Sequence, residues 1–254
     1  NLESLHFTVN ALAGASGVEF GFLPCDGNYD FFSAFPELPA SKIMNIDNLL
    51  YGRTVDIDLV KINERYCVNV AYIGIDTNIS RFFYHLFRLC RWFSFFHLNQ
   101  QWFKRWFNFL LFMFDMQPNS IRIRINGYAL LEDSYTAVMF ANTQKYGTGT
   151  TCAPLAKIDD GLVDLLFIKK FPLQAVIKMF NIYWNGRILE DDYARNYIEY
   201  RHCMNIEVET PESMFIAMDN VIYLYDKQFS IQSIPAALRL LLPVDTDAMI
   251  DDRR

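Results

Sequence analysis

The spacing of apolar residues at the start of the chain predicts a helix followed by a strand. Leu5, Val9 and Leu12 recur at helical intervals between residues 3 and 13, and GASG ends this pattern. VEFGFLP then predicts a short strand, and FFSAF after the next turn predicts a helix that PELP ends. The first 40 residues thus look like a helix-strand-turn-helix part of an α/β layer, whose sheet is completed by later strands or by residues ahead of Asn1.

From about residue 53 the pattern becomes β-rich, with apolar and polar residues alternating over many short segments. These segments are TVDIDLVKI, RYCVNVAYIGI, SIRIRING, YTAVMFAN, LVDLLFIKK, NIEVET, FIAMDNVIYLY, FSIQSI and LRLLLP. An aromatic stretch at 81–116 and a segment with helical spacing at 172–187 interrupt them. The pattern predicts an α/β part followed by a large β part.

Charge and cysteine content narrow the range of functions. The net charge of −6 and the pI near 5.2 disfavour binding to nucleic acid, which requires neutralisation of phosphates. The five cysteines are scattered singly, without a CxxC pair, so neither a disulfide framework nor a zinc site is indicated. We expect reduced, buried thiols in a cytosolic protein. No secretory signal is visible, and the longest apolar run, FLLFMF at 109–114, is far shorter than the ~18 residues of a membrane span.

The segment at 141–168, ANTQKYGTGTTCAPLAKIDDGLVDLLFI, is the most specific in the chain. By itself, Asp159-Asp160-Gly161 predicts a turn that starts a hairpin. Together with VDIDLVKINERYCVNVAYIGID upstream and MFIAMDNVIYLYDKQFSIQSIPAALRLLLP downstream, it resembles the diacylglycerol kinase catalytic family, which is related to sphingosine kinases and NAD kinases. The resemblance runs from about Asn10 to Pro243. It implies an α/β nucleotide domain and a β-sandwich domain, ATP held between them, and a lipid hydroxyl as phosphoryl acceptor.

The resemblance assigns the nucleotide to FGFLPCDGNYDFFSAF at 20–35, where the family has a turn of the type P-x-G-T-x-N-D-F. Pro24 and Asp30 match, whereas Asp26 takes the place of the glycine that lets backbone N–H groups approach phosphate. A carboxylate there faces away, holds Mg²⁺ or weakens ATP binding. The residues expected to bind ATP are Pro24, Asp26, Gly27, Asn28 and Asp30, with Ser4 in the position of the first phosphate loop, whose aspartate is replaced by Leu2.

The acceptor side is assigned to Asp219-Asn220-Val221, where the family has Asp-Gly-Glu. Asp219 is similar to the family's general base, while Val221 cannot bind metal. Without the family context, Asp219 is a turn residue at a strand end. We expect Asp219→Asn to abolish transfer and leave folding intact. The resemblance further assigns Mg²⁺ to Asp160 and Asp30.

The aromatic stretch from 81 to 116 holds fifteen Phe, Trp and Tyr residues together with Arg81, Arg88, Arg91, Lys104 and Arg105. Aromatic side chains interleaved with cations suit the headgroup region of a membrane. The alternative is a pair of helices whose aromatic residues are core.

These observations predict an ATP- and Mg²⁺-dependent lipid kinase in the cytoplasm, peripheral at the inner membrane face through residues 81–116. The expected organisation is a partial α/β nucleotide domain at 1–50, a β-sandwich lipid domain at 51–230 and a C-terminal segment at 231–254 that returns to the first domain. Two alternatives stay open: a catalytically impaired relative that binds lipid or a partner, and a kinase of a soluble acceptor. A nucleic-acid partner is not expected, and a homodimer stays open.

Overall fold

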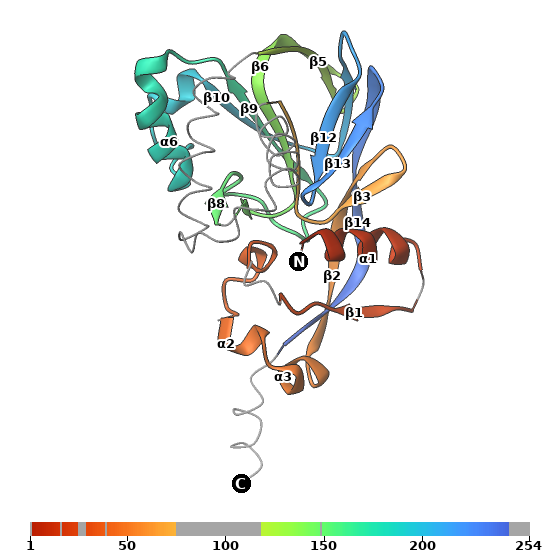
Figure 1. The fold of residues 1–254 in the computed structure, drawn as a ribbon. Coiled ribbons are helices and arrows are strands. Elements are labelled where there is room, and N and C mark those ends of the chain that lie inside the picture. Colours follow the sequence, from red (N-terminus) through yellow and green to blue (C-terminus); the bar gives the residue numbers. More distant parts are fainter. Residues whose placement is uncertain are drawn as a thin grey trace, which may run out of the picture.

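The computed structural model describes residues 2–15, 17–24, 29–38, 40–74, 118–147 and 149–243. A large curled β-sheet forms one part, and a smaller part with α1, α2, α3 and β1 lies at its end (Figure 1). The helical elements are α1 (Leu2–Leu12), the 3₁₀ turn η1 (Phe31–Ala34), α2 (Ala40–Ile43), α3 (Ile46–Leu50), η3 (Leu173–Ala175), α6 (Val176–Trp184) and η4 (Ala194–Asn196).

The strands run through the whole described chain. They are β1 (Glu19–Gly21), β2 (Arg53–Ile62), β3 (Arg65–Cys67), β4 (Val70–Gly74), β5 (Asn119–Ile125), β6 (Ala129–Ala141), β7 (Lys145–Tyr146), β8 (Thr150–Thr151), β9 (Val163–Lys169), β10 (Ile198–Cys203), β11 (Asn205–Glu209), β12 (Met214–Met218), β13 (Val221–Tyr225) and β14 (Gln228–Leu242). Twelve of them form one sheet with the central order β13-β12-β4-β6-β5-β11-β14-β2-β3, while β7 and β8 pair with each other.

The N-terminal part is joined to the end of the chain. The expected first helix is confirmed as α1, and the expected strand as β1, which pairs in parallel with β14 through Phe20 and Leu240. The sheet of this part is therefore extended by a strand from later in the sequence. A core of buried residues from α1, β1, η1, α2, β2 and β14 holds the part together.

The long strands β2 and β14 connect the two parts (Figure 1). Ile231 to Ile234 pair with Ile62 to Leu59, and Leu238 to Leu242 pair with Ile57 to Arg53, with a shift in register between these two runs. Pro235 cannot donate to the ladder and Ala236 has a φ of +48°, so the irregularity follows from the local sequence and conformation. FSIQSI and LRLLLP, expected as two strands, are thus one bent strand.

Strands β4 and β9 are buried on both faces. In β9, Val163, Leu165 and Phe167 belong to a core shared with β5, β11 and β14, whereas Leu166 and Ile168 pack on the other face with α6. This double burial explains the almost continuous apolar sequence of LVDLLFIKK. The helical expectation at 172–187 is confirmed by η3 and α6.

Two kinds of element were not predicted. Strand β10, IEYRHC, pairs with β9 only and carries partly exposed polar residues, which interrupt the alternation that marks a strand. The short helices α2 and α3 follow the PELP sequence; Asn45 begins α3 by accepting from the backbone N of Asp47 at 2.9 Å. Short elements of this kind leave too few residues for a periodic signal.

Asp58 of the DIDL segment ties the middle of β2 to two loops. Its buried carboxylate accepts from the backbone N of Gly161 at 2.6 Å and of Ala236 at 2.8 Å. It thereby fixes both the Asp159-Asp160-Gly161 turn and the bend in β14.

We expect Asp58→Asn to lower the free energy of unfolding by about 1–3 kcal/mol, because one of the two backbone N–H groups bound by the buried carboxylate would then face an amide NH₂ instead of an oxygen. Urea titration followed by far-UV circular dichroism measures this change. Asp56→Asn, an exposed position on the same strand, is the matched control and should change stability by less than about 0.5 kcal/mol. Equal losses of stability in both variants would contradict this role of Asp58 in joining β2 to the two loops, which we call the Asp58 clamp.

Candidate functional site

Asp219 lies in the two-residue turn that joins β12 to β13. Met218 and Val221 pair across this hairpin, and Asp219 and Asn220 have φ values of +48° and +71°. Positive φ at both central residues is typical of a type I′ turn, which favours Asn and Asp besides Gly. The interpretation of Asp219 as a turn residue is confirmed for the backbone. Asn220 can stand in the place of the family's glycine because it tolerates this conformation.

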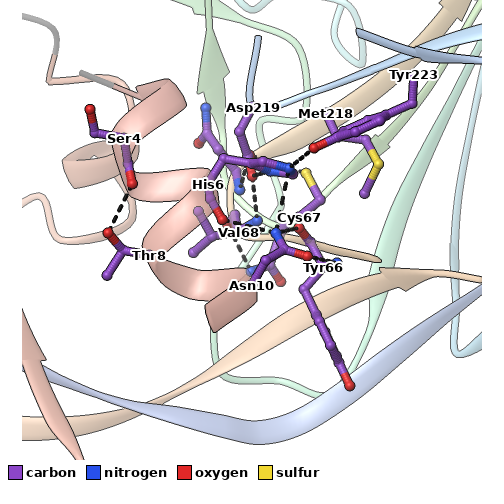
Figure 2. A network of polar contacts seen from close by, with 12 residues as sticks. Ser4, His6, Thr8, Asn10, Tyr66, Cys67, Val68, Met218, Asp219 and Tyr223 are labelled. Atoms are coloured by element: carbon purple, nitrogen blue, oxygen red, sulfur yellow. Dashed lines mark hydrogen bonds and ion pairs between the residues drawn. The ribbon is translucent and has the colours of Figure 1, made fainter. Parts of the chain in front are cut away.

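The side chain of Asp219 is buried and accepts four hydrogen bonds (Figure 2). Its Oδ1 accepts from the backbone N of Asn69 at 2.8 Å and from the Cys67 thiol at 3.1 Å. Its Oδ2 accepts from the backbone N of Val68 at 3.0 Å and from His6 Nδ1 at 3.0 Å. An ionised carboxylate offers about four lone-pair positions, so these four donors use all the hydrogen bonds that it can accept. Its role as general base stays a prediction, and an acceptor hydroxyl could reach it only after one donor leaves.

Cys67 contributes a protonated thiol to this arrangement. Burial raises the pKa of the Cys67 thiol well above its ordinary value, and the nearby Asp219 charge raises it further. The thiol therefore keeps its proton and donates it to the carboxylate, which makes Cys67 a structural rather than a reactive cysteine.

His6 of α1 connects Asp219 to the surface of β13. Its side chain is fully buried, and its Nε2 lies 2.8 Å from the Tyr223 hydroxyl (Figure 2). Because Asp219 accepts at Nδ1, the consistent tautomer carries its proton on Nδ1 and accepts from Tyr223 at Nε2. Two hydrogen bonds thus connect the side chains of Tyr223, His6 and Asp219 in that order.

Arg65 of β3 lies over the partly exposed ring of Tyr223, with its guanidinium carbon 4.4 Å from the ring centroid. Burial raises the pKa of the Tyr223 hydroxyl above its ordinary value, while the charge of Arg65 acts in the opposite direction. Tyr223 is thus the exposed end of a buried polar chain, and an exposed cation stands beside it.

Asn10 fixes α1 against β3, so that His6 reaches Asp219. Its Nδ2 donates to the carbonyl of Tyr66 at 2.8 Å, and its Oδ1 accepts from the backbone N of Tyr66 at 2.9 Å. The side-chain amide thus donates one hydrogen bond to the backbone of Tyr66 and accepts another from it, which explains why an asparagine suits the position.

The expected nucleotide residues fall partly within the described chain. Pro24 and Asp30 are buried, and Asp30 precedes η1, where its carbonyl accepts from the backbone N of Ser33 at 3.1 Å. Ser4 is exposed in the first turn of α1. Asp26, Gly27 and Asn28 lie outside the described residues. Element η1 lies against β7 of the Gly-rich turn, so the segment assigned to the nucleotide is close to the sandwich loops.

The carboxylate of Asp160, expected to hold magnesium, lies in a local turn. Asp160 is exposed, and its Oδ1 accepts from the backbone N of Leu162 at 3.0 Å, as in an Asx turn. The Asp159-Asp160-Gly161 turn leads into β9 but does not join a hairpin, because β8 before it pairs with β7. Within the described ranges, no three His, Cys, Asp or Glu side chains are grouped as ligands. The metal role of Asp160 and Asp30 stays a prediction.

The aromatic stretch at 81–116 lies outside the described residues, and its proposed membrane contact stays a prediction. Among the residues that the structure describes, no helix has both the length and the apolar composition needed to cross a membrane.

His6, Tyr223 and Asp58 were not singled out from the sequence. One signal was present for His6: with Leu2, Leu5 and Val9 it lies on the buried face of α1, at spacings of three and four residues. A histidine on such a face requires a hydrogen-bond partner. The identity of that partner, 213 residues away, was not visible in any local pattern.

Comparison with known proteins supports the fold. A sequence profile described as the YegS C-terminal NAD kinase beta sandwich-like domain matches residues 100–242, more than half of the chain. The crystal structure of a diacylglycerol kinase from Bacillus anthracis str. Sterne is 18% identical with a TM-score of 0.66, over 95% of this chain and 73% of the other.

Two further structures from the same organism, provisionally named as diacylglycerol kinases, are 17% and 18% identical, each with a TM-score of 0.70, and also match 95% of this chain and 74% and 75% of theirs. No curated protein sequence matches. The expected fold class, an α/β part plus a β-sandwich of the diacylglycerol kinase and NAD kinase type, is confirmed.

Proposed function

Because the chain belongs to the YegS C-terminal NAD kinase beta sandwich-like family, we propose that it is a lipid kinase that uses ATP. The hydroxyl oxygen of a diacylglycerol-like lipid attacks the γ-phosphorus of ATP, the bond to ADP breaks, and the hydroxyl proton leaves. Phosphoryl transfer of this kind asks the protein mainly to position the reactants and to stabilise charge. The structural relatives named as diacylglycerol kinases support this reaction class.

The observation that carries the proposal is the contact between α1 and the Asp219 turn. The resemblance assigns the start of α1 to the phosphates and the turn to the acceptor, and the His6–Asp219 contact joins the two across 213 residues. His6 is four residues beyond Leu2, about 6 Å along the helix axis.

Transfer of labelled γ-phosphate from Mg²⁺-ATP by the full chain tests the proposal. Three acceptors are compared: diacylglycerol in mixed micelles, diacylglycerol in vesicles with anionic lipid, and NAD as a soluble alcohol. We expect a labelled lipid product above a protein-free blank, with higher rates on anionic vesicles if residues 81–116 dock there. Transfer to NAD alone would replace the lipid acceptor with a soluble one.

We expect Asp26→Gly to strengthen ATP binding. A carboxylate about 4 Å from a phosphate charge costs about 1 kcal/mol even in water, so removing it should lower the dissociation constant at least about fivefold. Titration calorimetry measures the constant, and Asp26→Asn separates the charge from the glycine backbone. Unchanged or weaker binding in both variants would show that Asp26 does not oppose the phosphates.

The second candidate is a catalytically impaired relative that binds lipid. It is favoured by the four donors that occupy Asp219 and by Val221, which provides no metal ligand where the family has glutamate. ATP binding without transfer to any acceptor would support this candidate over the kinase.

A further inference from the structure

We propose that His6, and not Asp219, takes the proton of the acceptor hydroxyl, with Tyr223 passing that proton to it. The inference rests on the proposed kinase function and assigns the proton acceptor within it. Asp219 is then a positioning residue, which holds the imidazole in one tautomer and stabilises the imidazolium that forms.

Hydrogen-bond capacity favours this assignment. Asp219 already accepts from two backbone N–H groups, a thiol and an imidazole, and it is 2% exposed. Protonating it would break at least one of these buried bonds. His6 Nε2, in contrast, lies 2.8 Å from a hydroxyl group whose proton can move along that hydrogen bond, while the Asn10 amide nitrogen is further away at 3.4 Å.

The exposure of the side chains also favours proton transfer through Tyr223 to His6. The His6 side chain is fully buried and cannot touch an acceptor directly, whereas Tyr223 is partly exposed. The acceptor proton goes to the Tyr223 oxygen as the proton of Tyr223 goes to His6 Nε2. At the same time the acceptor oxygen bonds to the γ-phosphorus and the bond to ADP breaks, so the products are the phosphorylated acceptor, ADP, a neutral tyrosine and an imidazolium next to the Asp219 carboxylate.

The charged and titratable groups around the hydrogen-bonded series Tyr223, His6 and Asp219 favour this proton transfer. Asp219 faces Nδ1 from the β12–β13 turn, and Cys67 at the end of β3 is held protonated by burial. Arg65 of β3 lies 4.4 Å from the Tyr223 ring and stabilises negative charge on its oxygen during the transfer.

Variants of the full chain test the role. His6→Asn keeps a donor toward Asp219 but cannot take a proton, and Tyr223→Phe removes the hydroxyl. Each should lower kcat by about 10²–10⁴-fold with little change in KM for ATP. The double variant should be no worse than either single one, because the two groups act as a unit. In His6→Asn the acid limb of the pH profile of kcat should also disappear.

Tyr225→Phe is the matched control. Tyr225 lies on the same strand and interacts with Arg65 as Tyr223 does, but its hydroxyl donates to the carbonyl of Ile62 at 3.2 Å and not to His6. Its kcat should stay near the wild-type value. Wild-type kcat and pH profile in His6→Asn would overturn the proposal.

A readout independent of activity separates this inference from the kinase itself. ¹⁵N spectra of labelled histidine, with His6 assigned by its loss in His6→Asn, should show the proton on Nδ1 and not on Nε2. A proton on Nε2 would overturn the relay even in an active kinase. If the wild type transfers phosphate to no acceptor, the kinase proposal fails and the proton role falls with it, whichever tautomer is found.

Discussion

Replacing Asp219 by asparagine is expected to lower the free energy of unfolding by about 2–4 kcal/mol, and replacing it by alanine by about 3–5 kcal/mol. The carboxylate satisfies four buried donors from two segments of the chain, α1 and residues 67–69. An asparagine presents one oxygen and one NH₂ group, so two of these donors would face another donor. Alanine would leave all four without a partner.

Urea unfolding of both variants measures the effect, with Asp192→Asn as the matched control. Asp192 carries a 93% exposed carboxylate paired with Arg195, and the same change there should cost less than about 0.5 kcal/mol. A wild-type unfolding midpoint for Asp219→Asn would mean that the four hydrogen bonds are not formed in solution. The expectation from sequence that this variant folds normally is thus replaced by one of lower stability, and its activity has to be normalised to the folded fraction.

Gly74→Ala is expected to destabilise the protein by about 3 kcal/mol or more, for two reasons that add. Gly74 has a φ of +98°, which disfavours any side chain, and an added Cβ would lie 2.2 Å from the carbonyl oxygen of Thr136. Because Gly74 pairs with Ala137 of β6, relief of this overlap would push the two strands apart in the middle of the sheet.

Gly127→Ala isolates the conformational part of this cost. Gly127 has a similar φ of +76°, and nothing lies within 4 Å of its added Cβ. Its substitution should cost only about 1–2 kcal/mol. Differential scanning calorimetry of the two variants gives the comparison, and equal losses would show that β4 and β6 can separate locally without strain.

The polar cluster around Asp219 changes how the altered motif is interpreted. In the family pattern the aspartate stands next to glycine and glutamate, and here Asn220 and Val221 follow it. The type I′ backbone tolerates Asn220, so the hairpin survives the change. Val221 offers no carboxylate at the position of the glutamate that the resemblance assigns to metal binding.

Asp58 of β2 shows that a carboxylate in a motif shared with an enzyme family can have a structural role. The DIDL segment and the Asp159-Asp160-Gly161 turn both carry carboxylates, and both belong to the resemblance. In the fold, Asp58 accepts from the backbone of that turn, and Asp160 accepts from its own loop. Acidic residues in these segments therefore stabilise the conformations of the loops.

Periodicity along the chain was sufficient to predict many of the regular elements. Helix α1, the strands β2, β5 and β11, and the helix α6 follow from side chains that repeat every 3.6 or 2 residues, because burial of one face requires that spacing, whereas β9 follows from its almost continuous apolar run. A turn at Asp219 was also expected from the sequence, while its type I′ conformation became visible only in the structure. Motif order was enough to suggest the family and the lipid kinase hypothesis.

Which polar residues meet depends on how the elements pack in three dimensions. The parallel pairing of β1 with β14, the clamp at Asp58 and the chain of Tyr223, His6 and Asp219 join residues that are far apart in sequence. Periodicity reports which face of an element is buried, but it carries no information about the partner on the other side. The donors around Asp219 come from α1 and from the segment after β3, so its saturation became visible only once these elements were packed together.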